Sequence, residues 1–225
     1  MKFLYNKHNI IVLFVMVICL WGMYHGFRMG VADVLAYKAE YALKTWEKEK
    51  RLPNESEVGT AIINASSAVS WESANPEYMD LHAQVLLYKA LLYWGDNKFD
   101  PISALSVELY QRSIKRRPNW PYTWARLALV KSYRREYDAV FYEALSNAVK
   151  LGPWEPGVHT TLAAAGLFGW SELNIESRRL VASNIHRGLR FSHSELASII
   201  HRYRRKASVC GYVSVDEFSK SLCGW

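Results

Sequence analysis

The positions of the seven prolines constrain the fold of this chain more than any other feature. They stand at 53, 76, 101, 118, 121, 153 and 156, and the long stretches between them contain few or no glycines. In those stretches apolar residues recur every three or four positions, the spacing of one face of an α-helix. Proline is tolerated between helices and in their first turn, where its missing N–H leaves no hydrogen bond broken. The pattern predicts an all-α protein.

The expected helices that follow an N-terminal apolar segment cover nine ranges. They are 31–51, 56–71, 77–94, 102–116, 122–134, 137–151, 157–168, 175–189 and 194–207. None of these ranges shows the strict alternation of apolar and polar residues that marks a half-buried strand. Half of the residues are apolar and 14% are aromatic, which favours a packed core over disorder.

The segment from Ile10 to Phe27 reads IIVLFVMVICLWGMYHGF. At 1.5 Å of rise per residue, its length approaches the ~30 Å hydrocarbon core of a bilayer. Trp21 and Tyr24 near its end suit the interfacial aromatic belt. The apolar run is longer than that of a usual signal peptide, and no small-residue cleavage site follows it. We expect residues 1–30 to form a short tail and an uncleaved, single-pass transmembrane anchor.

Charge predicts the orientation of that anchor. The short tail carries Lys2 and Lys7 and no acidic residue. The positive-inside rule therefore places the tail in the cytoplasm and the remaining chain outside it. In a bacterium this arrangement means the inner membrane, with the C-terminal domain in the periplasm.

The spacing of the prolines predicts repeated helix pairs. Pro76, Pro118 and Pro153 lie 42 and 35 residues apart, close to the 34-residue period of tetratricopeptide repeats. After Pro118 the sequence PNWPYTWARLAL places Trp, Leu and Ala where that repeat has them, at Trp124, Leu127 and Ala128. We expect a helix pair at 31–75, degenerate repeats at 76–190 and a basic C-terminal helix and tail at 191–225. A generic helical bundle is the alternative.

Motifs of catalysis are missing from the sequence. None of the seven histidines lies in an H-E-x-x-H arrangement, and no G-x-S-x-G, Gly-rich phosphate loop or Cys/His ligand cluster occurs. Carboxylates are scattered over predicted helix surfaces. We therefore predict a protein that is not an enzyme, with no catalytic residue, cofactor or metal site.

Two sets of residues are candidates for an interaction surface. Nine Trp and fourteen Tyr are present, and Trp120, Tyr122 and Trp154 stand next to prolines, where their rings are candidates for stacking on a sugar or a peptide. The alternative is that these rings pack between helices. The second set, Arg202, Arg204 and Arg205, belongs to a region, 178–206, with eight basic residues and one acid. Such a surface suits lipid head groups or an acidic glycan, or it is a solvated face; outside the cytoplasm nucleic acid is not expected.

Cys210 and Cys223 are the two cysteines outside the apolar segment. They lie 13 positions apart, with no further cysteine nearby to complete a four-ligand zinc site. A disulfide that closes this tail in an oxidising compartment and a pair of free thiols are both compatible with the sequence.

The anchor, the degenerate repeats and the phrases PNWPYTWARLAL and LGPWEPGVH together resemble the VpsP-type polysaccharide biosynthesis proteins of bacterial exopolysaccharide gene clusters. The resemblance implies an accessory role in making or exporting an extracellular polysaccharide, through contacts with other inner-membrane proteins. It supplies no catalytic residue. A structural subunit of a stable inner-membrane complex is the alternative function.

Overall fold

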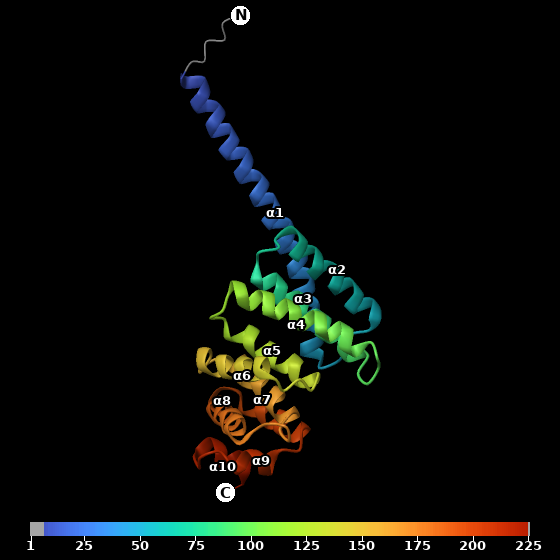
Figure 1. Cartoon of the computed structure of the whole chain (residues 1–225), viewed down its shortest axis with the longest axis vertical. Coiled ribbons are helices and arrows are strands. Elements are labelled where there is room, and N and C mark those ends of the chain that lie inside the picture. The colour runs from blue at the N-terminus through green and yellow to red at the C-terminus, as the bar shows by residue number, and fades with distance from the viewer. Residues whose placement is uncertain (1–6, 225) are drawn as a thin grey trace, which may run out of the picture.

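The computed structural model describes residues 7–224, which form ten helices and no strand. The helices stack along one long axis, with the start of α1 at one end and α10 at the other (Figure 1). Their bounds are α1 Lys7–Glu49, α2 Glu55–Trp71, α3 Pro76–Leu92, α4 Phe99–Arg116, α5 Pro121–Tyr133, α6 Ala139–Leu151, α7 Pro156–Phe168, α8 Ile175–Arg202, α9 Lys206–Cys210 and α10 Glu217–Cys223. The predicted all-α class is confirmed.

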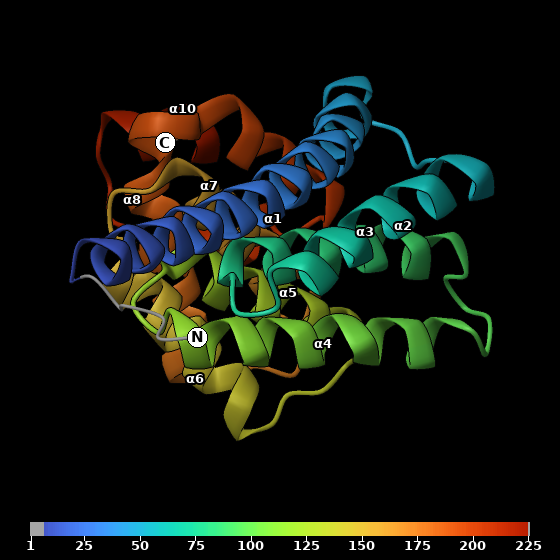
Figure 2. The same ribbon diagram turned by 90° about the horizontal axis from the view of Figure 1, so that it is seen from above.

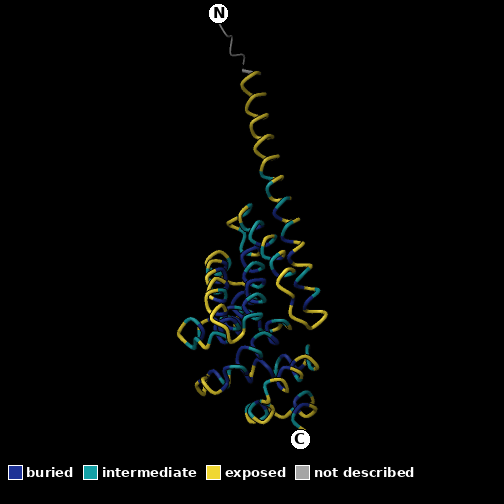
Figure 3. Tube along the Cα trace, turned by 90° about the vertical axis from the view of Figure 1, so that its right-hand side faces the viewer, coloured by how far each residue is buried: buried dark blue, intermediate teal, exposed yellow. Residues whose placement is uncertain are grey.

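The first half of α1 projects from the rest of the molecule (Figure 1). Its large apolar side chains, from Ile10 to Phe27, are exposed, and among them Phe14 has 65% of its surface accessible. Figure 3 shows most of this stretch as exposed. By length and composition α1 is able to cross a membrane. The basic Lys2, on which the orientation depends, lies outside the described residues.

The second half of α1 is the first helix of the packed array. Its buried residues recur at intervals of four and three positions, which is one face of a helix: Ala32, Ala36, Ala39, Leu43 and Trp46. This face packs against Val58, Ala61 and Ala65 of α2 and against Val85 of α3. One helix therefore carries both the projecting apolar stretch and the start of the array, with no linker between them.

The remaining helices continue the array as antiparallel pairs. Helices α1 and α2, α3 and α4, α5 and α6, and α7 and α8 pack within pairs, and α1, α3, α5 and α7 also contact one another in succession. Figure 2 shows the pairs stacked behind one another when the molecule is seen from above. This is the arrangement of a helical-repeat array.

Small residues allow the two helices of a pair to approach closely. On α4 the Ser106 hydroxyl donates to the Ala83 carbonyl at 2.7 Å, and the Ser113 hydroxyl donates to the Pro76 carbonyl at 3.1 Å. Between α7 and α8, a Cβ placed on Gly166 would lie 2.4 Å from a methyl carbon of Val181. Contacts this short leave no room for a larger side chain.

One helix boundary expected from the sequence is missing, and the tail contains two further short helices. The anchor and the helix expected at 31–51 are one continuous helix. The helices expected at 175–189 and 194–207 correspond to the two helical parts of α8, which meet at the non-helical Ser192 (φ −140°, ψ 44°). The short helices α9 and α10 lie in the tail, where Asp216 accepts hydrogen bonds from the N–H groups of Phe218 and Ser219 and starts α10.

Candidate binding groove

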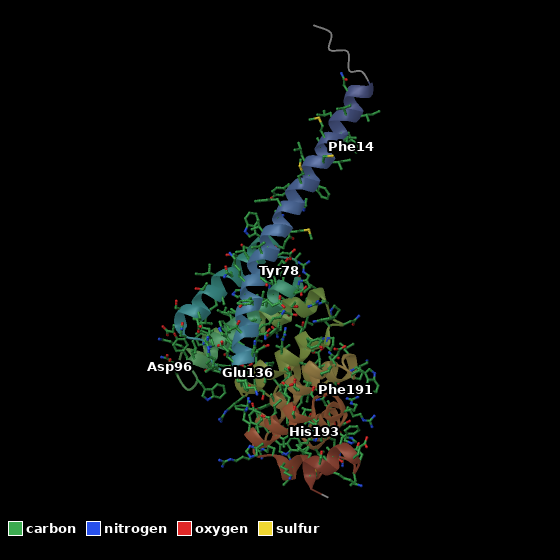
Figure 4. The ribbon with its side chains drawn as sticks, turned by 180° about the vertical axis from the view of Figure 1, so that it is seen from behind. Phe14, Tyr78, Asp96, Glu136, Phe191 and His193 are labelled. Atoms are coloured by element: carbon green, nitrogen blue, oxygen red, sulfur yellow. A yellow bond between two sulfur atoms is a disulfide. The ribbon has the colours of Figure 1, made fainter. Side chains whose placement is uncertain are left out.

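A cavity of about 790 Å³ lies where α1 meets the first helices of the next two pairs. We call it the groove. Its walls come from α1, α3, the loop between α4 and α5, the start of α5, and the residue that precedes α7. Figure 4 labels Tyr78, one of its lining residues, at the place where α1 enters the array.

The wall on α1 is a polar stripe that runs beside the buried stripe of the same helix. Its members, again spaced by four and three positions, are Asp33, Tyr37, Glu40, Lys44 and Glu47. Each stands one position after a buried residue of α1, so the helix buries one face and turns the adjacent face to the groove. The Glu40 carboxylate pairs with Lys44 at 2.6 Å, and the Glu47 carboxylate accepts from the Gln84 amide at 3.0 Å.

Asp80 on α3 is the most buried acidic group of the groove, with 4% of its side chain exposed. One of its carboxylate oxygens, Oδ2, accepts from the Thr123 hydroxyl at 2.5 Å and from the Arg117 guanidinium at 3.2 Å. The other, Oδ1, has no hydrogen-bond partner. Burial raises the pKa of Asp80 above the ordinary value, although hydrogen bonds and the nearby arginines oppose that shift.

Aromatic rings form the opposite wall. The Arg117 guanidinium lies over the Trp120 ring, 4.4 Å from its centroid, and the Tyr122 ring lies 5.5 Å from that of Trp120. The Tyr122 hydroxyl donates to Glu155 at 2.7 Å. Burial, together with that carboxylate, raises the pKa of Tyr122 to about 12, so the hydroxyl stays protonated at neutral pH.

The groove is acidic within a basic chain. Six carboxylates line it against three cationic side chains, a net charge of −3, whereas the whole chain carries +7. Carboxylates and aromatic faces side by side are suited to hold positively charged groups. Among the residues that the structure describes, no three His, Cys, Asp or Glu side chains are arranged to bind a metal ion.

The structure separates the two sets of residues that the sequence suggested. Trp120 and Tyr122 lie together in the groove, whereas Trp154 is 65% exposed and does not line it. Arg202 is the last residue of α8, and Arg204 and Arg205 lie between α8 and α9. Helices α9 and α10 lie at the end of the molecule farthest from the apolar stretch of α1 (Figure 1).

Cys210 and Cys223 are joined by a disulfide, with their Cα atoms 5.8 Å apart. The bond ties the end of α9 to the end of α10 and closes the tail against α8, which contacts both short helices. The sequence alone left this pairing open.

The acidic residues of the groove were missed by sequence reasoning. Asp33, Glu40 and Glu47 look like an ordinary solvated helix face, and Asp80 stands alone in an apolar region. The signal that was present is the spacing of the polar stripe on α1, which matches that of the neighbouring buried stripe. Nothing in the spacing tells which other helix faces it.

Comparison of the chain with protein-family models, with curated proteins and with solved structures gives no match.

Proposed function

We propose that this protein is a membrane-anchored scaffold that holds a partner protein in its groove, next to the membrane. The observation that carries the proposal is the double use of α1, whose apolar stretch projects from the array and whose polar stripe forms a wall of the groove. A partner bound there would be held at a fixed height above the membrane surface.

The proposed location is the bacterial inner membrane, with the array in the periplasm. The basic N-terminal tail supports this orientation through the positive-inside rule. The Cys210–Cys223 disulfide supports it independently, because disulfides persist in oxidising compartments such as the periplasm.

The proposed biological setting is exopolysaccharide synthesis or export. It rests on the resemblance to VpsP-type proteins in the anchor, the repeats and the two quoted phrases. The fold agrees with a scaffold in one respect, since repeat arrays present extended surfaces to their partners. The partners would be inner-membrane proteins that polymerise or export the polysaccharide.

An affinity purification from membranes of the native host tests this function. The full-length protein is compared with a groove variant, Tyr37→Ala with Trp120→Ala, and with a matched variant that removes two exposed apolar side chains outside the groove, Ile63→Ala with Leu105→Ala. We expect glycosyltransferases, a polymerase or an export channel to co-purify with the unaltered protein and with the matched variant. We expect them to be lost from the purification of the groove variant.

Stoichiometric recovery of one unrelated membrane complex by all three proteins would overturn the scaffold proposal. It would favour the alternative function, a permanent structural subunit whose contacts lie outside the groove.

A further inference from the structure

We propose that the groove binds an extended segment of a partner protein that carries arginine or lysine at alternating positions. This inference deepens the scaffold role and rests on it, because it names the chemistry of the bound segment.

The first support is the charge of the groove relative to the rest of the molecule. Its lining has a net charge of −3 in a chain of +7, so acidic groups are concentrated here against the overall composition. One of them, Glu77 in the first turn of α3, is exposed and has no ion-pair partner among the described residues. A positively charged segment is attracted to this surface, and an acidic one is repelled.

The second support is independent of the charge count. Asp80 is almost fully buried, lines the groove, and leaves its Oδ1 atom without a partner. A buried carboxylate oxygen with no hydrogen bond is costly, and a nearby positive charge offsets that cost. Oδ1 itself is shielded from solvent, so a guanidinium or ammonium group in the groove stabilises this carboxylate through its opposite charge.

The third support is the way in which the protein's own Arg117 is held. Its guanidinium is bound to Asp80 on one side and stacked on Trp120 on the other. The pairing of a carboxylate with an aromatic face is the environment that arginine prefers. The exposed Tyr37, beside Asp33 and Glu40 on α1, offers a second ring next to acidic groups.

The length of the groove favours a peptide over a small cation. The polar stripe on α1 runs from Asp33 to Glu47, which is about 21 Å along the helix axis. An extended peptide of six or seven residues spans about the same distance. Because side chains of an extended chain alternate between two faces, basic residues at every second position all face the polar stripe.

The test uses the full-length protein in nanodiscs of phosphatidylcholine, which carries no net charge. The probe is a fluorescein-labelled octapeptide of four Arg-Gly units, and its control has four Glu-Gly units. We expect saturable binding of the arginine peptide by fluorescence anisotropy, weakened as salt is raised, and no binding of the glutamate peptide.

Two double variants that change the net charge equally locate the binding. Glu40→Gln with Glu77→Gln removes two groove carboxylates, whereas Glu108→Gln with Glu143→Gln removes two exposed carboxylates on α4 and α6 that do not line the groove. The first pair of substitutions should lower the affinity for the arginine peptide by about fivefold. The second pair should leave that affinity unchanged within experimental error. All four side chains are exposed, so both variants are expected to fold.

Three results would overturn the inference: equal binding of the glutamate peptide, an equal loss in both double variants, or displacement of the arginine peptide by an equal concentration of spermine. The last would assign the groove to small polyamines. If the host purification recovers partners through the groove while the arginine peptide does not bind, the scaffold role stands and this assignment falls.

Discussion

The Asp33 carboxylate, six residues beyond the apolar stretch of α1, accepts a hydrogen bond from the Tyr78 hydroxyl on α3. Arg28, closer still to that stretch, donates to the Trp71 carbonyl and pairs with Glu72 at 3.5 Å. The helix that leaves the apolar stretch is thus attached to α2 and α3 within its first two turns. The array and the apolar stretch are expected to move as one rigid body.

An insertion that interrupts α1 should uncouple the two parts. Spin labels on Cys19, the free cysteine of the described chain, and on a Lys150→Cys substitution on α6 measure the distance between them by pulsed electron paramagnetic resonance. We expect a narrow distance distribution in the unaltered helix, and a broad one when six Gly and Ser residues are inserted after Gly30.

The same insertion between Asp96 and Asn97 serves as the control, since this turn joins α3 to α4 at the edge of the molecule (Figure 4). It should leave the distribution narrow. A distribution that stays narrow after the insertion at Gly30 would mean that α1 does not carry the coupling.

Two glycine substitutions should have opposite effects on stability. At Gly166 a Cβ would meet Val181 at 2.4 Å, so Gly166→Ala forces α7 and α8 apart and should lower the free energy of unfolding by about 1–3 kcal/mol. At Gly59, within α2, nothing lies within 4 Å of the added carbon. Gly59→Ala should therefore raise the free energy of unfolding by about 0.5–1 kcal/mol. Urea unfolding followed by circular dichroism measures both, and equal effects at the two positions would contradict the close packing of α7 and α8.

Loss of the disulfide should affect the tail and spare the groove. Cys210→Ser with Cys223→Ser is expected to destabilise α9 and α10 by about 2–4 kcal/mol, because the unfolded tail regains its freedom. Limited trypsin digestion should then cut faster at Lys206 and Lys220, while binding of the arginine peptide is unchanged. The control, Cys19→Ser, should alter neither. Faster cleavage throughout the array would show that the tail supports more of the fold than its contacts indicate.

The sequence could predict the packing of individual helices, but it could not predict the groove. The motif residues Trp124, Leu127 and Ala128 are buried as the repeat pattern requires, because the pattern depends on contacts between neighbours in the chain. Glu40 of α1 and Arg117 of the α4–α5 loop both line the groove. Residues so far apart in the chain line one groove only because α1, α3 and α5 pack in succession, which no local sequence pattern encodes. The expected boundary between the anchor and the helix at 31–51 does not occur, and Gly26 and Gly30 next to it both lie inside α1.

Acid should weaken the array through a buried lysine. Lys131 is 4% exposed and forms ion pairs of 2.9 Å with both Glu136 and Asp138. Partial burial by itself would raise the pKa of each carboxyl. Hydrogen bonds from Arg134 and Lys131 to Glu136, and from Lys131 to Asp138, outweigh it, so both pKa values lie below their ordinary range.

A carboxyl whose pKa is lowered by folding stabilises the fold above its unfolded pKa, near 4, and this stabilisation is lost as the pH falls through the folded pKa. The melting temperature should therefore be steady above about pH 5 and fall below about pH 4. Lys131→Met should reduce this acid-induced fall, because it removes the charge that lowers both pKa values. An identical profile in the variant would show that the ion pairs do not contribute.

The most direct test of the account is photocrosslinking in living cells of the native host, with benzoylphenylalanine placed at one position at a time. Tyr37 lies in the groove, and Leu105 is an exposed position on α4 outside it. We expect a covalent adduct at Tyr37 whose captured peptide contains several arginines or lysines, its loss when Glu40→Gln and Glu77→Gln are added, and no adduct at Leu105. An adduct at Leu105 with none at Tyr37 would contradict the claim that the groove is where this protein binds its partner.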